Sequence, residues 1–392
     1  MNLGFATPVS LQRLRPLVAE GDRLPQGSTF APAADWVREL LRRGHYVTLY
    51  TTAPDISSPL TFRGDSILIR IVPLRSKGTG RDLFSAERRL LGQLMREDCC
   101  TLIHAHWTYE FALAALASGI PTLVTIHDQP WKVLRHFRDA HRVARLLMAY
   151  KTALCARHFA AVSAGAAGHF RRYLNPGACI EVIPNGVPNA LFELGRHDHC
   201  PVNHRTRFAT ILQGWTRLKN GAAALAAFAK ARESIPGATL AMFGLDYEPG
   251  GPAQQWAIRN RLAEAVSFVG PLNYEELLTH VSAEVDILLH PSLNETFSMT
   301  ILECMALHKP VLVGLHTSGM REMLGQEGGM FVDVSDPSSI AQSMIRLARD
   351  HDLCHFLSRH AFERARRLYR LETVIDRYEA LYRQVLRAEA QA

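Results

Sequence analysis

The chain has 392 residues, of which 47% are hydrophobic and 21% charged, and its formal net charge is +7. This length exceeds what one hydrophobic core usually fills, so we expect two domains. No apolar run reaches the roughly 18 residues of a membrane-spanning helix, the start of the chain lacks a signal-peptide pattern, and the seven cysteines form no C-x-x-C pair. We therefore expect a cytoplasmic protein with reduced thiols.

The first half of the chain alternates strand-like and helix-like segments. Apolar runs predict strands at 46–51, 67–72, 102–106, 122–126, 160–163 and 180–183. Helical periodicity predicts helices at 35–43, 84–97 and 113–118. Strands separated by helices indicate a parallel sheet with helical crossovers, which is a doubly wound layout. We assign 1–187 to a first domain of this class.

A basic segment runs from 131 to 173, with nine Lys or Arg residues against one Asp. Arg135, Arg138, Arg142 and Arg145 recur at helical spacing and predict one basic stripe on an amphipathic helix. Such a stripe is either a solvated face or a surface that meets anionic lipid or a phosphorylated acceptor. No recognition motif or aromatic platform accompanies it, so we expect no nucleic-acid partner.

The second half repeats the alternation after a polar stretch at 188–206 that we interpret as a linker. Strands are predicted at 208–213, 239–243, 266–269, 285–290, 310–313 and 330–333. Helices are predicted at 222–235, 274–281, 297–308 and, as two long helices, within 352–386. We assign 207–370 to a second doubly wound domain and 371–392 to a separate C-terminal helix.

Two carboxylates, Glu295 and Glu303, lie eight positions apart across the junction between the strand at 285–290 and the helix at 297–308. Glu295 is predicted at the helix entrance, and Glu303 about two turns further along nearly the same face. A helix N-terminus suits a diphosphate, and carboxylates beside it suit sugar hydroxyls. The alternative is an ordinary strand, turn and helix in which both acids are structural.

A second candidate site is the loop at 213–221, which follows a strand and opens a helix. Gly214 and the cations Arg217 and Lys219 would let this loop meet a diphosphate, unless the two cations are a solvated surface pair.

In the first domain, His104, His106, His127 and Asp128 end two neighbouring strands. They indicate a polar pocket, with satisfied core histidines as the alternative. The run His197-Asp198-His199-Cys200 lies in a polar connecting segment, and His104-x-His106 has no third ligand at a recognisable spacing, so we expect no metal site.

The segment from His290 to Val311 resembles the E-x7-E signature of the family 4 retaining glycosyltransferases, which have the GT-B fold. The usual form is close to PS-x-x-E-G-F-G-x-x-x-x-E-A-M-A-x-G-x-P-V. The matching residues are Glu295, Phe297, Glu303, Met305, Ala306, Pro310 and Val311, while Thr296, Ser298 and His308 replace glycines. Ile183 to Val187 is similar to the IPNGV stretch that ends the first domain in this family, so the resemblance covers nearly the whole chain.

The resemblance implies a GT-B fold, with two facing Rossmann-like domains, a cleft between them, and a last helix that crosses back to the first domain. It implies retaining, metal-independent transfer from a UDP- or GDP-sugar. Glu295 and His127 would lie by the transferred sugar and Glu303 on the nucleotide ribose. The remaining donor-binding positions are Gly214, Arg217, Lys219, Thr296, Phe297, Ser298 and Gly27, the last as counterpart of a glycine loop in the first domain.

The implied acceptor is a carbohydrate or a lipid-linked one, in bacterial cell-surface polysaccharide or glycolipid assembly. Contact with the inner face of the membrane through anionic lipid is a further expectation. The alternatives are a natural-product glycosyltransferase, a nucleotide-sugar epimerase on the same fold, and a catalytically inactive binding protein.

Overall fold

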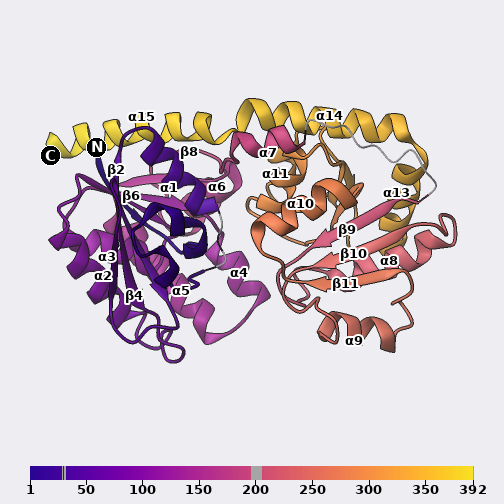
Figure 1. Ribbon diagram of the computed structural model, residues 1–392, viewed down its shortest axis with the longest axis horizontal. Coiled ribbons are helices and arrows are strands. Elements are labelled where there is room, and N and C mark those ends of the chain that lie inside the picture. The colour runs from indigo at the N-terminus through magenta and orange to yellow at the C-terminus, as the bar shows by residue number, and fades with distance from the viewer. Residues whose placement is uncertain (29, 31, 196–204, 392) are drawn as a thin grey trace. The chain divides into compact units, whose positions relative to one another are not determined.

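The computed structural model describes residues 1–28, 30, 32–195 and 205–391, and it divides the chain into two compact units (Figure 1). The first unit combines Met1–Gly186 with Leu371–Ala392, and the second is Val187–Arg370. The predicted bounds are 1–187 for the first domain, 207–370 for the second and 371–392 for the last helix. The last segment of the chain thus belongs to the same unit as the first half.

The first unit is built on an eight-stranded sheet in the order β3-β4-β2-β1-β5-β6-β7-β8. Its strands are β1 (Asn2–Ala6), β2 (Tyr46–Ala53), β3 (Leu60–Arg63), β4 (Ile67–Pro73), β5 (Leu102–His106), β6 (Thr122–Ile126), β7 (His158–Ala161) and β8 (Ile180–Val182). All neighbours pair in parallel except β3 with β4. The winding direction reverses between β1 and β5, and open sheets of this kind bind ligands at such a switch point.

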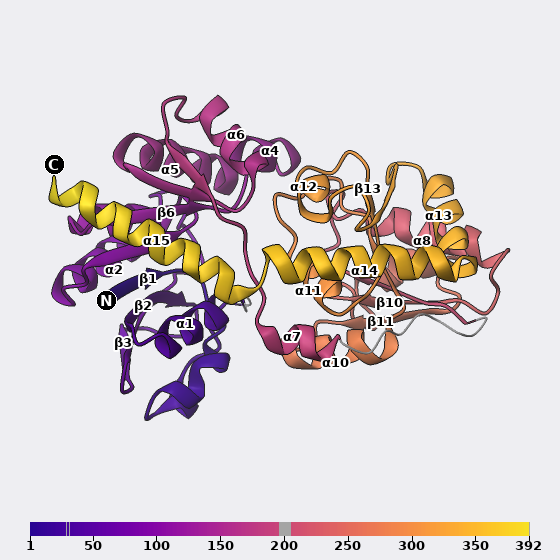
Figure 2. The same cartoon turned by 90° about the horizontal axis from the view of Figure 1, so that it is seen from above.

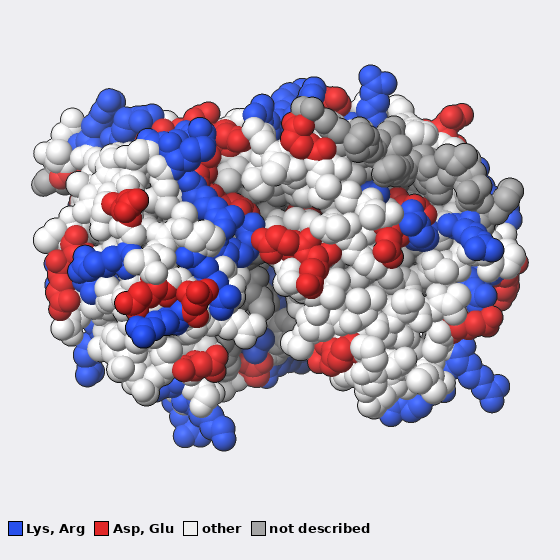
Figure 3. Space-filling view, viewed as in Figure 1, with Lys and Arg blue, Asp and Glu red and all other residues white. Residues whose placement is uncertain are grey.

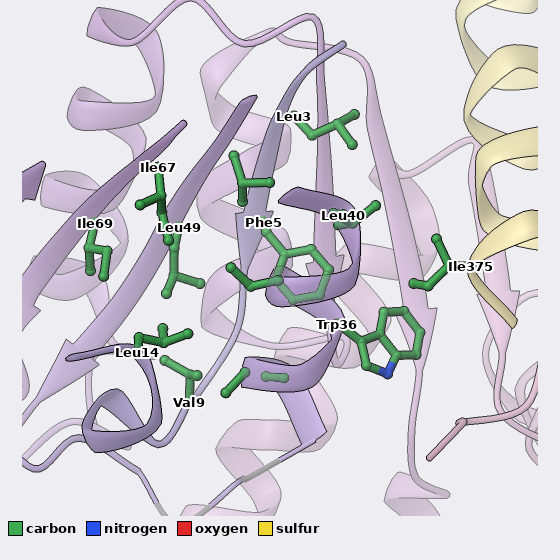
Figure 4. Packing of buried hydrophobic residues seen from close by; sticks show 14 of the residues in the cluster. Leu3, Phe5, Val9, Leu14, Trp36, Leu40, Leu49, Ile67, Ile69 and Ile375 are labelled. Carbon is green, nitrogen blue, oxygen red and sulfur yellow. The ribbon is translucent and has the colours of Figure 1, made fainter. Parts of the chain in front are cut away.

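Helices cover both faces of this sheet. They are α1 (Pro32–Arg42), α2 (Ser85–Glu97), α3 (Glu110–Ser118), α4 (Pro130–His136), α5 (Ala140–Cys155), α6 (Ala164–Tyr173) and α15 (Leu371–Ala390), with short 3₁₀ helices at Leu11–Leu17 and Gly21–Arg23. Because successive strand residues point to opposite faces, Leu3 and Phe5 of β1 pack on one side with Trp36 of α1 and Ile375 of α15 (Figure 4). Helix α15 lies along this unit, against α1 and β6 (Figure 2).

The second unit has a six-stranded, wholly parallel sheet in the order β11-β10-β9-β12-β13-β14. Its strands are β9 (Arg207–Ile211), β10 (Thr239–Phe243), β11 (Val266–Gly270), β12 (Ile287–His290), β13 (Val311–Gly314) and β14 (Met330–Val332). Its helices are α7 (Asn189–Leu194), α8 (Gly221–Arg232), α9 (Pro252–Arg259), α10 (Tyr274–Glu284), α11 (Met299–Ala306), α12 (Met320–Leu324), α13 (Pro337–Arg349) and α14 (His351–Leu368). The winding reverses between β9 and β12.

The predicted fold class, two doubly wound α/β domains, is confirmed. Sequence analysis missed the central strand β1. The prediction of an irregular linker at 188–206 is wrong for α7, where Leu191 and Phe192 are buried in the second unit. A Cβ on Gly195 would lie 2.2 Å from the carbonyl oxygen of Ala306, so the chain after α7 passes directly against α11. A helix of six residues is too short to show a periodic apolar pattern.

The basic stripe predicted from Arg135 to Arg145 is wrong as a single helical face. Helix α4 ends before α5 begins, and the Asp139 side chain caps α5 by accepting a hydrogen bond from the backbone N–H of Arg142. The Arg142 guanidinium pairs with the same carboxylate at 3.0 Å. The Arg145 guanidinium lies over the Tyr109 ring, 4.9 Å from its centroid. The break resets the helical phase, so sequence spacing no longer places these side chains on one face.

Charged side chains of both signs are interspersed over the face of the molecule drawn in Figure 3. In the ranges that the structure describes, no helix is both long and apolar enough to cross a membrane.

Candidate functional site

In the second unit, the loops that follow β9 and β12 meet at the switch point of the sheet. The backbone N–H of Leu293 donates to the carbonyl of Leu218 at 2.9 Å. Asn220 begins α8 in the left-handed conformation, with φ of 58°, and its side-chain amide donates to the carbonyls of Pro291 at 3.1 Å and Val334 at 2.8 Å. Asparagine tolerates this conformation better than most residues, so Asn220 ties the two loops together.

Lys219 and Glu295 face each other across this junction. The Lys219 ammonium lies 2.7 Å from the Glu295 carboxylate, and the side chains are 25% and 15% exposed. Nε2 of His290, the last residue of β12, lies 3.3 Å from the same carboxylate oxygen. Burial by itself would raise the pKa of Glu295, but the hydrogen bond from His290 and the charge of Lys219 outweigh it and lower the pKa to about 2. Glu295 is therefore an ionised carboxylate held beside a cation.

This pairing predicts a pH-dependent difference in stability between the wild type and Glu295→Gln. A carboxylate whose pKa is lowered on folding stabilises the fold above its ordinary pKa of about 4.5, and this contribution is lost as the pH falls toward 2. The difference in free energy of unfolding between the two proteins should therefore shrink as the pH is lowered from 6 to 3. Denaturant titrations across that range measure it. A difference that stays constant with pH would contradict the pairing.

The segment after β12 shows how Glu295 is positioned. Helix α11 begins at Met299, with Ser298 as its N-cap, so the predicted helix at 297–308 starts two residues too early. Glu295 lies in the loop before the helix, and helical spacing therefore does not relate it to Glu303. A Cβ on Gly319 would lie 2.5 Å from the carbonyl oxygen of Thr296, so the chain entering α12 supports this loop by backbone contact.

Two of the predicted donor-binding residues in this loop have structural contacts. The Ser298 hydroxyl accepts the backbone N–H of Ile301, which caps α11. The Phe297 ring packs 5.7 Å from the ring of Tyr369 at a steep angle. Of the three family glycines replaced here, only His308 has positive φ, 56°, while Thr296 and Ser298 do not. The side chains at 296 and 298 therefore cause no backbone strain.

Glu303 is buried in α11, with 7% of its surface exposed. The Tyr274 hydroxyl, at the start of α10, donates to its carboxylate at 2.9 Å. Sequence reasoning missed Tyr274, because this contact joins residues 29 positions apart on different helices.

The loop at 213–221 presents its two cations differently. Arg217 is exposed and has no ion pair or hydrogen bond with the described residues, whereas Lys219 is engaged with Glu295. Gly214 has φ of 86°, and its backbone N–H donates to the carbonyl of Leu245. The loop thus offers one paired and one free positive charge at the start of α8.

In the first unit, the strand-end histidines form a stack in which His104 and His106 are buried and His127 is partly buried. Nδ1 of His106 lies 2.8 Å from Nε2 of His127. The His127 ring is stacked on Trp107, 4.3 Å between centroids, and on His106, 5.0 Å. Burial lowers the pKa of His127 to about 3, and that of His106 well below its ordinary value. Both rings are therefore neutral near pH 7.

The tautomers of His106 and His127 follow from the hydrogen bonds that their ring nitrogens make. Nε2 of His106 is buried and has no partner among the described residues. A proton there would be an unsatisfied buried donor, which costs more than an unused acceptor among aromatic rings. Nδ1 of His106 therefore carries the proton and donates to Nε2 of His127. His127 then holds its own proton on Nδ1, which makes that nitrogen a donor.

Helix α15 completes the stack from the far end of the chain. Nδ1 of His104 lies 2.8 Å from the Tyr382 hydroxyl, and Nε2 lies 2.7 Å from the Thr125 hydroxyl. Tyr378, one turn earlier on α15, lies 4.8 Å from Trp36, centroid to centroid. Sequence reasoning missed both tyrosines. Their i, i+4 spacing was the available signal that they share a helix face.

Asp128 lies beside a different group of polar side chains. The Tyr109 hydroxyl donates to Asp128 at 2.6 Å. Burial raises the pKa of the Asp128 and Glu110 carboxyls, and the charge of Arg145 opposes this shift in both.

Gly27 follows β1 in the chain and has φ of 71°. A Cβ on Gly27 would lie 2.7 Å from the carbonyl oxygen of Val9, whose partner is the backbone N–H of Ser28. Gly27 thus lets its loop close on the segment after β1.

The described residues include no group of three or more His, Cys, Asp or Glu side chains that would hold a metal ion. The motif at 197–200 lies outside the described residues. The rings of His104 and His106 are engaged in hydrogen bonds with their neighbours.

Two family profiles match the chain. Residues 33–190 match the profile of Glycosyltransferase Family 4, and residues 203–364 match that of Glycosyl transferases group 1. The matched ranges cover most of both units.

Similar curated proteins match over shorter stretches. An N-acetyl-alpha-D-glucosaminyl L-malate synthase of Bacillus anthracis is 32% identical over 129 residues, which are 32% of this chain and 32% of that protein. A D-inositol 3-phosphate glycosyltransferase of Corynebacterium jeikeium is 30% identical over 189 residues, which are 46% and 44% of the two chains. The chain therefore spans less than half of the length of these two relatives.

Solved structures match over almost the whole chain. A sucrose-phosphate synthase from Thermosynechococcus elongatus has a TM-score of 0.74 at 18% identity and covers 99% of this chain and 100% of its own. The Anabaena protein HepE, in complex with UDP and glucose, has a TM-score of 0.66 at 16% identity and covers 97% and 98%. At these identities the likeness shows the fold.

Proposed function

Since the chain belongs to family 4 of the glycosyltransferases and has the GT-B type of fold, we propose that it transfers a sugar from a nucleotide diphosphate sugar to an acceptor. The observation that carries the proposal is the ion pair of Lys219 and Glu295 at the switch point between β9 and β12. A cation beside a helix start suits the diphosphate, and an ionised carboxylate suits the sugar.

In the proposed reaction, the charge that develops on the departing diphosphate is met by Arg217, Lys219 and the N-terminal end of α8. These groups supply positive charge without a metal ion, so we propose metal-independent transfer. Glu295 lies by the sugar and stabilises the positive charge that develops on its ring. We propose retention of the anomeric configuration, and a UDP- or GDP-sugar as donor.

The histidine stack has a separate proposed role. With its Nε2 accepting from His106, His127 offers an Nδ1–H donor, which we assign to a hydroxyl of the transferred sugar. Because burial keeps the ring neutral, this contact is a hydrogen bond and not an ion pair, and it should be independent of pH above about 5.

The function is tested by offering the full chain a panel of UDP-, GDP- and other nucleotide sugars. A donor present at 100 times its dissociation constant should stabilise the protein by ~2.7 kcal/mol. Product analysis with the best donor then separates the candidates. A new glycoside supports transfer, a converted free nucleotide sugar indicates an epimerase, and binding without products indicates an inactive binding protein. Loss of activity in EDTA that a divalent ion restores would overturn the metal-independent mechanism.

Arg217→Ala and Lys219→Ala should each weaken binding of the nucleoside diphosphate at least tenfold and leave nucleoside binding nearly unchanged, because only the phosphates feel these charges. Calorimetry with UDP and uridine, or the matching pair for the best donor, measures both. The control is Lys230→Ala, an exposed lysine later in α8 whose ammonium contacts only the Ser338 hydroxyl among the described residues. Equal losses for both ligands would mean that the residues act through structure.

Glu303→Gln should weaken donor binding by ~1.5–3 kcal/mol if the carboxylate hydrogen-bonds a ribose hydroxyl. Because Glu303 also accepts from Tyr274, Tyr274→Phe is the matched variant. It removes the internal hydrogen bond and leaves the carboxylate. Calorimetry should show the loss in Glu303→Gln alone, and an equal loss in Tyr274→Phe would assign the effect to the packing of α10 on α11.

The acceptor side of the proposal is a carbohydrate, free or lipid-linked, in cell-surface polysaccharide or glycolipid assembly. A cytoplasmic location with peripheral contact at an anionic membrane belongs to the same proposal. Because the predicted basic stripe is interrupted between α4 and α5, the proposed membrane contact is supported by the exposed cations Arg135 and Arg138 alone. A small natural product is the alternative acceptor.

A further inference from the structure

A cavity of about 450 Å³ opens between α4 and α6 in the first unit. Trp131, Lys132 and Arg135 line it from α4, and His169 and Tyr173 line it from α6. We call it the α4–α6 cavity. Both helices start at the edge of the sheet where β6 and β7 end, and α4 begins three residues after His127. Its volume falls within the roughly 300–1,000 Å³ of small-molecule sites.

The aromatic lining is exposed but held in place. Trp131 is 36% exposed and Tyr173 is 43% exposed. The Trp131 indole N–H donates to the Tyr150 hydroxyl at 3.0 Å, and the Tyr173 ring lies 4.8 Å from the ring of His169. Exposed aromatic rings with fixed positions offer flat apolar surfaces for the C–H face of a sugar ring.

The polar lining is of one charge sign. Lys132 and Arg135 are cations, and among the described residues that line the cavity none is acidic. Burial lowers the pKa of the Lys132 ammonium, which means that its charge is partly desolvated. Guanidinium and ammonium groups together suit a phosphate.

The third observation is an unsatisfied nitrogen. His169 is 6% exposed, and its Nε2 has no hydrogen-bond partner among the described residues. Burial and the charge of Lys132 lower the pKa of His169 to about 4, so the ring is neutral. Buried polar atoms in native proteins nearly always have a partner, and because this nitrogen is itself buried, it would meet a ligand hydroxyl only after a shift of the His169 side chain.

We propose that the α4–α6 cavity is an acceptor subsite that binds a sugar phosphate, with the phosphate on Lys132 and Arg135 and the sugar ring against Trp131 and Tyr173, beside His169. The assignment of this site to the acceptor rests on the proposed function, whereas binding of the sugar phosphate does not. The ligand is either a soluble sugar phosphate or the head group of a lipid-linked one.

The test is saturation-transfer NMR on the full chain with a panel of hexose phosphates, with UDP present so that the site in the second unit is occupied. Neutral hexoses and inorganic phosphate are the comparison ligands. A hexose phosphate should bind at least tenfold more tightly than either comparison ligand. Trp131→Ala and Arg135→Gln should each weaken it at least tenfold. The matched control is Arg138→Gln, an exposed arginine beyond the end of α4 that does not line the cavity, and it should bind as the wild type does.

A second arm separates the two sources of the ligand. Neutral vesicles that carry a polyprenyl-phosphate-linked hexose should float the wild type but not Trp131→Ala if the ligand is lipid-linked, and only the soluble panel should bind if it is not. Binding of the panel that is unchanged in both cavity variants, absent binding, or equal binding of neutral hexose would overturn the proposal. If the protein binds the sugar phosphate but turns over no donor, the result supports the subsite and refutes only the glycosyltransferase activity.

Discussion

Replacing Glu295 by Gln is expected to lower turnover by roughly a hundredfold or more, while the variant stays folded. The substitution keeps the shape of the side chain and removes its charge, which matters most when positive charge develops on the sugar ring. It also leaves Lys219 without its partner at 2.7 Å. Since the Lys219 side chain is 25% exposed, water can solvate the ammonium, and the fold should tolerate the change.

Initial rates at saturating donor measure this loss, with thermal unfolding as the check on folding. Glu363→Gln is the matched control, because Glu363 lies on α14 of the same unit and, among the described residues, pairs only with the exposed Arg366. It should keep wild-type turnover. Turnover near the wild-type value in a folded Glu295→Gln protein would remove Glu295 from the catalytic machinery and would leave its ion pair with Lys219 as a structural contact.

Ile375→Asp is expected to prevent the first unit from folding. Ile375 is fully buried where α15 meets the core formed by Trp36, Phe5 and their neighbours (Figure 4). The change removes ~1.5–3 kcal/mol of apolar burial and places a carboxyl among apolar groups, at a cost of several kcal/mol more. Together these approach the whole stability of a typical domain, about 5–15 kcal/mol.

The measurement is the yield of soluble protein and its denaturant unfolding curve. Arg383→Asp serves as the control, because it introduces the same side chain at an exposed position of the same helix. Arg383→Asp should unfold as the wild type does. A soluble Ile375→Asp protein with a wild-type unfolding curve would show that α15 contributes little to the first unit.

The local patterns of the sequence predicted most strands and helices within a few residues. The reason is that the apolar residues of a strand or helix with one buried face recur with the period of that element. They did not predict the strands β1 and β3 or the helices α6, α7, α9 and α13, and of these the six-residue α7 is too short to show a helical period. They also missed the interruption between α4 and α5, because the Asp139 cap is formed by one hydrogen bond and not by a change of composition.

The candidate site likewise has features that the local sequence predicts and features that it does not. The sequence by itself determined the class of fold, the E-x7-E segment with Glu295 and Glu303, and the strand-end position of His127, since each depends on neighbours a few residues away. Only the tertiary structure decided which side chains these residues contact. Lys219 meets Glu295 across 76 positions, and Tyr382 meets His104 across 278. Such pairs form when parallel strands bring loops to one edge of a sheet, so their geometry depends on packing that no local spacing contains.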